Sequence, residues 1–199
     1  MKTFFIDCET TGTDPKKHSL IQIAGTIFNG SELVDEINYT LRPFPGDEIE
    51  PRALEVNGRT AEEIQTFPKA KDVHDQFTEK VLARHVDRYN KADKLHFIGY
   101  NSDFDAEFVR AWFRKSGDNY FGSWFWYPII DVAKLAGIRL MQTRASLPDF
   151  KLMTVAKHLG VRTDDGDAHD AAFDIKVTMR MFNKLTKDLG LFEFGATLE

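Results

Sequence analysis

The feature that most constrains the fold is a set of three strand-like runs joined by short connections at the start of the chain. Residues 20–28 are rich in β-branched and large apolar side chains, and Asn29-Gly30 follows them as a strong tight-turn signal. Beyond the turn, apolar and polar residues alternate over 37–41, as in a more exposed strand. Together with the apolar run at 4–6, this pattern predicts an antiparallel meander.

After the meander, helical and strand-like patterns alternate along the chain. Apolar residues recur at four-residue spacing within 71–89 and predict a helix, and 94–101 reads as a buried strand. The remaining expected elements are a helix carrying Phe104, Phe108 and Trp112 on one stripe, a short strand within 126–131, a helix from about Val132, a helix at 152–159 and a long helix at about 168–185. This order predicts an α/β fold with a mixed sheet and helices on both faces.

The composition predicts one soluble domain spanning residues 1–199. The chain is 42% hydrophobic and 29% charged, which is typical of a globular protein, and no linker-like stretch divides it. No apolar run approaches the roughly 18 residues that cross a bilayer, and an acid follows the first residues too soon for a secretory signal. The single cysteine excludes an internal disulfide and is typical of a reducing compartment, so we expect a cytoplasmic protein.

The net charge of −5 weighs against long-range attraction to duplex nucleic acid. It leaves open a small single-stranded substrate held in a local groove. Bound metal could also match part of the excess acid, which a formal charge count ignores.

Asp7 and Glu9 follow the first apolar run. Side chains alternate along a strand, so these two carboxylates should project from one face while Cys8 points to the other. Two acids at the end of a buried strand need a basic partner, protonation or a divalent cation. The alternative is that the strand ends at Asp7 and that water solvates both acids.

Asp105 and Asp174 each fall at the border of a predicted buried helix face. A structural role is available to both: Asp105 would complement the dipole of its helix, and Asp174 could meet a basic side chain. His169 lies five residues before Asp174, a rotation of about 140° on a regular helix. The two could share a site only if His169 occupies the entrance of the helix, which the preceding "TDDGDA" loop makes plausible.

Three segments in this order resemble the exonuclease motifs of the DEDDh 3′–5′ exonucleases, the family that includes the proofreading subunit of bacterial replicative polymerase. They are "DCETTG" at 7–12, "YNSDFD" at 100–105 and "AHDAAFD" at 168–174. The segments "EPRALEVNGRT" and "FKLMTVAKHLGV" also resemble connecting parts of that family. The family often has His where this chain has Tyr100, and His-Gly where it has Asn57-Gly58, so this chain departs from the family pattern at two positions outside the four acids and His169. The resemblance implies a single RNase H-like domain with a mixed five-stranded sheet.

The resemblance also implies the active-site residues. Asp7, Glu9 and Asp174 would hold the ion that activates the attacking water, Asp7 would bridge to a second ion with the help of Asp105, and His169 would be the general base. Two cations about 3.5–4 Å apart suit phosphodiester hydrolysis. Hard oxygen ligands favour Mg²⁺ or Mn²⁺, and the absence of a Cys/His cluster in the sequence weighs against zinc.

Substrate contacts have two interpretations each. Thr10 and Thr11 would bind the terminal nucleotide, or would only shape the turn that leads to Gly12. Phe104 would stack against a base, or would pack in the core, which its helical register favours. The aromatic residues of "WFWYP" at 124–128 are interpreted as core, and Asp131 as a helix cap.

The sequence therefore predicts a metal-dependent exonuclease that shortens single-stranded DNA from the 3′ end and releases nucleoside 5′-monophosphates. Trimming of RNA is an alternative, because the sequence does not locate a contact to the 2′-hydroxyl. A second alternative, of another class, is a non-catalytic nucleic-acid-binding module associated with a polymerase. A polymerase partner is compatible with either function.

Overall fold

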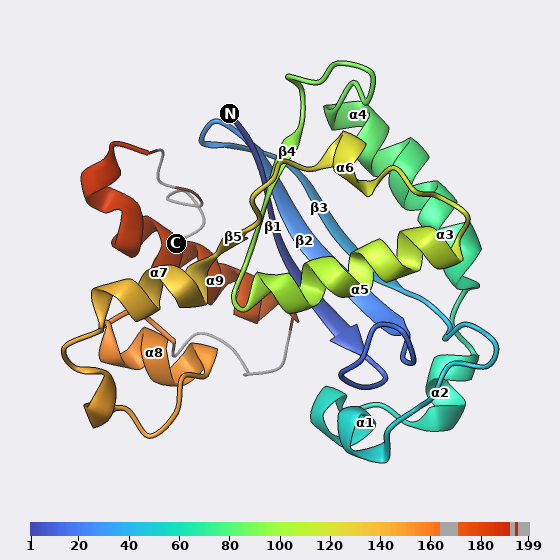
Figure 1. Ribbon diagram of the computed structural model, residues 1–199, viewed down its shortest axis with the longest axis horizontal. Coiled ribbons are helices and arrows are strands. Elements are labelled where there is room, and N and C mark those ends of the chain that lie inside the picture. The colour runs from blue at the N-terminus through green and yellow to red at the C-terminus, as the bar shows by residue number, and fades with distance from the viewer. Residues whose placement is uncertain (164–170, 192–193, 195–199) are drawn as a thin grey trace.

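The computed structural model describes residues 1–163, 171–191 and 194 (Figure 1). The strands are β1 (Lys2–Thr10), β2 (Leu20–Asn29), β3 (Glu32–Thr40), β4 (Leu95–Gly99) and β5 (Ile130–Asp131). The α-helices are α1 (Pro51–Asn57), α2 (Ala61–Gln65), α3 (Ala70–Gln76), α4 (Ala83–His85), α5 (Ser102–Lys115), α6 (Phe121–Trp124), α7 (Val132–Arg139), α8 (Leu152–His158) and α9 (Ala171–Thr186). A π-helical segment, η1 (Phe77–Leu82), joins α3 to α4, and two short 3₁₀ turns are η2 (Arg144–Ser146) and η3 (Lys187–Leu189).

The five strands form one mixed sheet in the order β3-β2-β1-β4-β5. The first three are antiparallel neighbours, as the Asn29-Gly30 turn predicts, whereas β4 and β5 continue the sheet in parallel with β1. The parallel strands need crossover connections, and the helices supply them. The expected mixed five-stranded α/β fold is confirmed.

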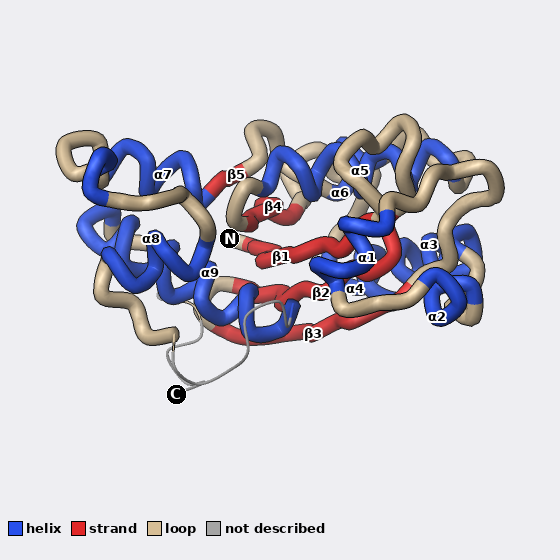
Figure 2. Tube along the Cα trace, turned by 90° about the horizontal axis from the view of Figure 1, so that it is seen from below, coloured by secondary structure: helices blue, strands red, loops and turns tan. Residues whose placement is uncertain are grey.

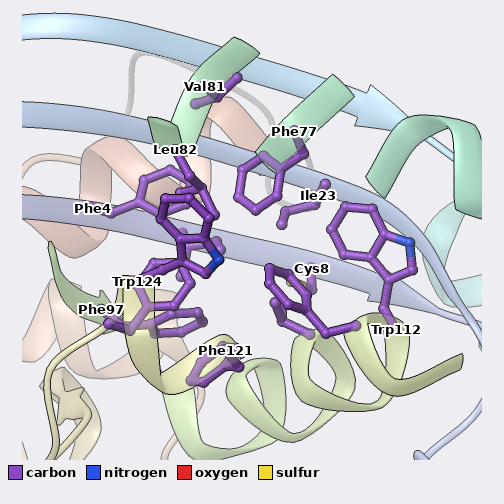
Figure 3. Close-up of a cluster of buried hydrophobic side chains, with 14 of the residues drawn as sticks. Phe4, Cys8, Ile23, Phe77, Val81, Leu82, Phe97, Trp112, Phe121 and Trp124 are labelled. Atoms are coloured by element: carbon purple, nitrogen blue, oxygen red, sulfur yellow. The ribbon is translucent and has the colours of Figure 1, made fainter. Parts of the chain in front are cut away.

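Helices cover both faces of the sheet (Figure 2), and the alternation of side chains along the central strand β1 divides the core between these faces. Phe4, Ile6 and Cys8 pack with α3, η1, α5 and α6, and Figure 3 shows the aromatic rings that fill this side. Phe5 points to the opposite face and packs with α7, α8 and α9. Each face of the sheet is therefore closed by helices, and the carboxyl end of β1 is left for the site.

Two details differ from the expected elements. The helical run after Ala70 contains the π-helical turn and ends at His85, short of residue 89. The aromatic run at 124–128 is not uniformly core, because Trp124 and Phe125 are buried but Tyr127 is 87% exposed. The start of the last helix is described only from Ala171, so its expected beginning at 168 lies outside the described residues. In the described part of the chain, no helix is long and apolar enough to span a membrane.

Candidate active site

The first motif lies within β1 and not beyond its end. The strand continues to Thr10, and its antiparallel pairing sets Asp7 opposite Ala24 and Glu9 opposite Gln22. Both carboxylates are partly buried. The alternative in which the strand ends at Asp7 and both acids are fully solvated is therefore wrong.

The end of β1 is open on the side of β4. The last paired residues of these two parallel strands are Phe5 and Ile98, so β1 extends well past the end of β4. Helix α5 begins at Ser102, directly after β4, and its first turn comes to this free edge (Figure 1). The turn buries Asp105, which is only 4% exposed.

The buried Asp105 carboxyl lies against β1. Its pKa is raised to about 8, mainly by desolvation and to a smaller extent by the nearby Glu9 charge. Hydrogen bonds from the Cys8 thiol and from the backbone amides of Asp105 and Cys8 act in the opposite direction. The same surroundings raise the pKa of the Cys8 thiol well above its usual value, with burial as the main cause. Asp105 therefore has a defined position beside β1, as a site residue requires.

Helix α9 brings the fourth acid to the same place. The pKa of Asp7 is raised well above its usual value. Burial is the largest cause, and repulsion from Asp105, Glu9 and Asp174 adds to it. Burial also raises the pKa of Glu9 to about 7, with added repulsion from Asp174. The structure thus brings together all four carboxylates that the three motifs predict, from one strand and two helices.

This cluster of acids has little compensating positive charge in the described residues. Of Asp7, Glu9 and Asp105, only Glu9 has a cation close enough to lower its pKa, the guanidinium of Arg59. Arg59 also pairs with Glu63 at 2.5 Å. Carboxylates in such a setting must either take up protons or bind cations, and hard divalent ions prefer oxygen donors of this kind. The donor set therefore fits Mg²⁺ or Mn²⁺.

The described residues do not include a group of three or more His, Cys, Asp or Glu side chains already arranged to hold an ion. Assignment of Asp7, Glu9, Asp105 and Asp174 as metal ligands therefore stays a prediction, supported by their electrostatic coupling. The expected general base His169 lies outside the described residues.

A cavity of about 290 Å³ opens beside Glu9 and is formed by β1, the turn after it, α1 and the start of α5. Its lining residues are Cys8, Glu9, Thr10, Gly12, Thr13, Glu50, Arg52, Ala53, Val56, Asn57 and Phe104. On the α1 side of this cavity, the sequence offered only Arg52, as one of several scattered basic residues that could contact a phosphate or be solvated surface. The segment "EPRALEVNGRT", which resembles a connecting part of the family, covers the same helix.

Thr10 and Thr11 both shape the turn after β1. Thr10 Oγ1 donates to the Gly12 carbonyl at 2.7 Å, and Thr11 Oγ1 donates to the Glu48 carbonyl at 2.7 Å. Thr11 is fully buried and is not among the residues that line the described cavity, whereas Thr10 is. The turn-shaping interpretation is confirmed, and a contact with substrate stays a prediction for both residues.

The position of Phe104 is compatible with both of its interpretations, packing in the core and stacking against a base. Its ring packs on Phe108 with centroids 4.8 Å apart, as the helical stripe predicts. The side chain is nevertheless only partly buried, and it lines the cavity. Stacking against a nucleotide therefore stays a prediction that this position permits.

His18 fixes the loop of the first motif and was not expected from the sequence. A side chain at Gly12 would overlap the His18 imidazole, which is 3% exposed. His18 Nδ1 accepts the Asp14 backbone N–H at 2.9 Å, and His18 Nε2 lies 3.1 Å from Glu50 on the cavity wall. Gly12 is thus required because a ring occupies the space next to it.

Tyr100 and Asn101, the first two residues of the second motif, make structural contacts, and one of these contacts is to Asp131. Asp131 caps α7 through Ala133 N–H at 2.9 Å, as expected, and also accepts the Asn101 N–H at 2.9 Å. Asn101 adopts a left-handed φ of 62° before α5 and makes no side-chain cap. Tyr100, where the family often has His, donates to the Phe150 carbonyl at 2.7 Å.

Comparison with known proteins agrees with this geometry. The family model described as "Exonuclease" (RNase_T) matches residues 4–182, which is most of the chain. Ribonuclease T of Buchnera aphidicola is 25% identical over 198 residues, covering 92% of this chain and 84% of that protein. The PolC-type DNA polymerase III of Thermotoga maritima is 27% identical over 177 residues, covering 89% of this chain but only 11% of the polymerase.

Solved structures of Escherichia coli exonuclease I share the fold. The complex with a dT13 oligonucleotide has a TM-score of 0.69 at 21% identity, covering 94% of this chain and 41% of that one. A zinc-bound form of its complex with single-stranded DNA has a TM-score of 0.70, with the same identity and 41% coverage of that chain. This chain thus spans less than half of exonuclease I and about a tenth of the polymerase. The chain belongs to the exonuclease family and is a DEDD-type 3′–5′ exonuclease with the RNase H-like fold.

Proposed function

We propose that this exonuclease uses two divalent cations, Mg²⁺ or Mn²⁺, to remove nucleotides from the 3′ end of single-stranded DNA. The observation that carries the proposal is the crowding of Asp7, Glu9, Asp105 and Asp174, because burial, with added mutual repulsion, raises the pKa values of the first three. The family generally depends on divalent metal, and the cluster offers the oxygen donors that such ions prefer.

Each carboxylate has its own role in the proposal. Asp7, Glu9 and Asp174 would hold one ion, and Asp7 with Asp105 would hold the second. Bound cations would acidify the attacking water and stabilise charge on the phosphate and on the leaving 3′ oxygen. His169 would accept the proton of the attacking water, because an imidazole with an ordinary pKa is largely neutral at pH 7. Cleavage of the P–O3′ bond would release a nucleoside 5′-monophosphate and leave a new 3′-hydroxyl.

The cavity beside Glu9 would receive the terminal nucleotide. Phe104 and Val56 offer apolar surface for a base, and Arg52 at the same wall offers a cation for a phosphate. The turn at Thr10 and Thr11 would fix the sugar through backbone groups, because the hydroxyl protons of both residues are already donated within the turn. The cavity is next to Glu9, so the terminal phosphodiester would reach the acids.

DNA is the first choice of substrate because the first motif, "DCETTG", resembles that of the proofreading branch of the family. In addition, the structurally similar exonuclease I was solved with dT13 and dA16 oligonucleotides. Trimming of RNA is the second candidate, since this chain covers 84% of the Ribonuclease T of Buchnera aphidicola. Family membership favours catalysis over a purely binding module. The PolC relative supports a polymerase as a possible partner, and the single cysteine supports a cytoplasmic location.

The test uses oligonucleotides labelled at the 5′ end, in DNA and RNA versions of one sequence, with Mg²⁺, Mn²⁺ or chelator. We expect metal-dependent shortening from the 3′ end in steps of one nucleotide, and faster loss of DNA. Faster loss of RNA would replace DNA by RNA as the substrate. Equal shortening in chelator, or none with any metal, would contradict the proposed chemistry.

A further inference from the structure

Asp131 holds the starts of two helices with one carboxylate oxygen. Its Oδ1 accepts the backbone N–H of Ala133 at 2.9 Å, which caps α7, and the backbone N–H of Asn101 at 2.9 Å, directly before α5. The second bond joins residues that are 30 positions apart in sequence. Asp131 is 7% exposed, so water competes little for either bond. This carboxylate is therefore a fixed part of the fold and not a solvated surface acid.

The sheet explains why Asp131 reaches the start of α5. Strands β4 and β5 pair in parallel, with Asp131 beside Gly99, the last residue of β4. Each strand leads into a helix, β4 into α5 and β5 into α7 (Figure 1). A side chain at Gly99 would come within 3.0 Å of the Ile6 carbonyl oxygen and 3.1 Å of Ser102 Cβ. The start of α5 thus packs directly on the strand ends, next to Asp131.

The start of α5 needs an acceptor from outside the helix. The first N–H groups of an α-helix have no partner within it. Asn101, the N-cap residue, has a left-handed φ of 62°, and its side chain makes no cap hydrogen bond. Ser102 Oγ donates to the Ile130 carbonyl at 3.0 Å instead of capping the helix. Asp131 supplies the acceptor for the Asn101 N–H, and its negative charge also complements the positive end of the helix dipole.

The turn that Asp131 holds is the one that carries Asp105. Asp105 lies four residues after Asn101, about 6 Å along the helix, and is buried beside Cys8 and Glu9 of β1. Because one helical turn is stiff, a shift of Asn101 moves Asp105 with it. Asp131 is not among the charges that chiefly raise the pKa values of the acids on β1 and of Asp105. It therefore acts on the site through the backbone of α5 and not as a fifth acid.

We propose that Asp131 is a positioning residue that fixes Asp105 for metal binding through its hydrogen bond to the Asn101 N–H. The inference rests on the proposed function, because the role of Asp105 in metal binding is itself proposed. Asp131 does not line the cavity beside Glu9, so its loss should lower turnover with little effect on substrate binding. Residues that orient metal ligands typically contribute about 10–100-fold, and a displacement of about 1 Å can cost about 100-fold.

Three substitutions at Asp131 separate its two hydrogen bonds. Asp131→Asn keeps Oδ1 and should keep both bonds. Asp131→Ser should keep the cap of α7, since serine is a good N-cap residue, but its shorter side chain should not reach the Asn101 N–H. Asp131→Ala loses both bonds. Asp118→Ala is the matched control, because Asp118 Oδ1 accepts the backbone N–H of Tyr120 at 2.7 Å beyond the other end of α5.

Amide hydrogen exchange of Asn101 and steady-state kinetics in Mn²⁺ test the two steps of the inference separately. The substrate is whichever oligonucleotide, DNA or RNA, the wild type shortens faster. Asp131→Ser and Asp131→Ala should both exchange the Asn101 amide faster and lower kcat about 10–100-fold, with KM close to that of the wild type. Asp131→Asn should resemble the wild type in exchange and in kcat. Asp118→Ala should lower the melting temperature but keep kcat.

Two outcomes would overturn the inference. One is Asp131→Ser with the kcat of the wild type, whether or not the Asn101 amide exchanges faster. The other is Asp131→Asn with the low kcat of Asp131→Ala, because the charge and not the hydrogen bond would then be required. If Asp131→Ala does not fold, Asp131→Ser and Asp131→Asn decide the question, since both keep the cap of α7.

Asp105→Asn separates this inference from the proposed function. An Asp105→Asn enzyme with wild-type turnover would contradict the proposed role of Asp105 in metal binding. The exchange of the Asn101 amide does not depend on activity, so it would still show whether Asp131 holds the start of α5. An inactive Asp105→Asn enzyme together with a fully active Asp131→Ser enzyme would contradict the positioning role of Asp131 alone.

Discussion

Asn57 Nδ2 donates a 2.9 Å hydrogen bond to the Thr10 carbonyl, and this contact ties the end of α1 to the end of β1. The two residues are far apart in sequence, yet both line the cavity beside Glu9. Gly58 directly after Asn57 adopts a left-handed φ of 63° and ends the helix. The position at which the family often has His thus has an amide that fixes one cavity wall.

Asn57→Ala should move this wall. Loss of one partly buried hydrogen bond should lower the free energy of unfolding by about 1 kcal/mol and raise KM for a short oligonucleotide, with a smaller effect on kcat. Denaturant unfolding and steady-state kinetics measure both. Asn38→Ala is the control, because Asn38 accepts an exposed hydrogen bond from Gln22 away from the cavity. Equal effects of the two substitutions would contradict the role of Asn57.

Gly12→Ala should destabilise the loop of the first motif. The new methyl group would overlap the buried His18 ring, and overpacking typically costs about 1–3 kcal/mol. Gly137→Ala, in α7, meets no atom and should stabilise the protein by about 0.5–1 kcal/mol. Urea unfolding of both variants tests this difference in sign, and a neutral or stabilising Gly12→Ala would show that the loop can yield.

The central strand shows how far the sequence predicts the site. The alternation of Asp7, Cys8 and Glu9 correctly placed the cysteine in one core and the acids away from it, because the side-chain period of a strand is fixed. The continuation of β1 to Thr10 was not predicted. It depends on pairing with β2, whereas the local pattern, an apolar run followed by acids, also suits a strand that ends.

The rest of the site depends on long-range contacts that no local pattern encodes. Arg52 and Val56 reach the cavity only because α1 folds back onto the end of β1. Similarly, the space that His18 fills beside Gly12 becomes visible only when the loop is folded. Tyr127 is exposed despite its apolar neighbours, so composition alone misplaced it.

Metal-free protein should lose stability as pH rises. Folding raises the pKa of Glu9 to about 7 and that of Asp105 to about 8, in both cases mainly by burial. A raised pKa in the folded state means that the folded protein binds more protons than the unfolded chain. The contribution of these two groups to the free energy of unfolding is therefore fully present below about pH 4 and is lost progressively up to about pH 8. Melting temperatures in chelator should therefore decrease from pH 5 to pH 8. Added Mn²⁺ should offset more of this loss at pH 8 than at pH 5, and an equal shift at both values would contradict cation binding by these acids.

Asp105→Asn should separate stability from activity. The substitution removes a buried negative charge, so the metal-free variant should melt at a higher temperature than the wild type at pH 9. It should also lose activity at least about 100-fold, since even residues that only orient metal ligands cost 10–100-fold. Asp103→Asn is the matched control, because Asp103 is exposed and pairs with Lys134 at the surface. If the two variants behave alike in melting and in turnover, Asp105 is not a site residue.

The most direct test of the account is anomalous diffraction from crystals soaked in Mn²⁺. Four carboxylates from β1, α5 and α9 that repel one another should gather manganese. We predict two anomalous peaks, one in contact with Asp7, Glu9 and Asp174 and one in contact with Asp7 and Asp105. Crystals without a peak among these residues, from protein that still shortens oligonucleotides in Mn²⁺, would contradict it.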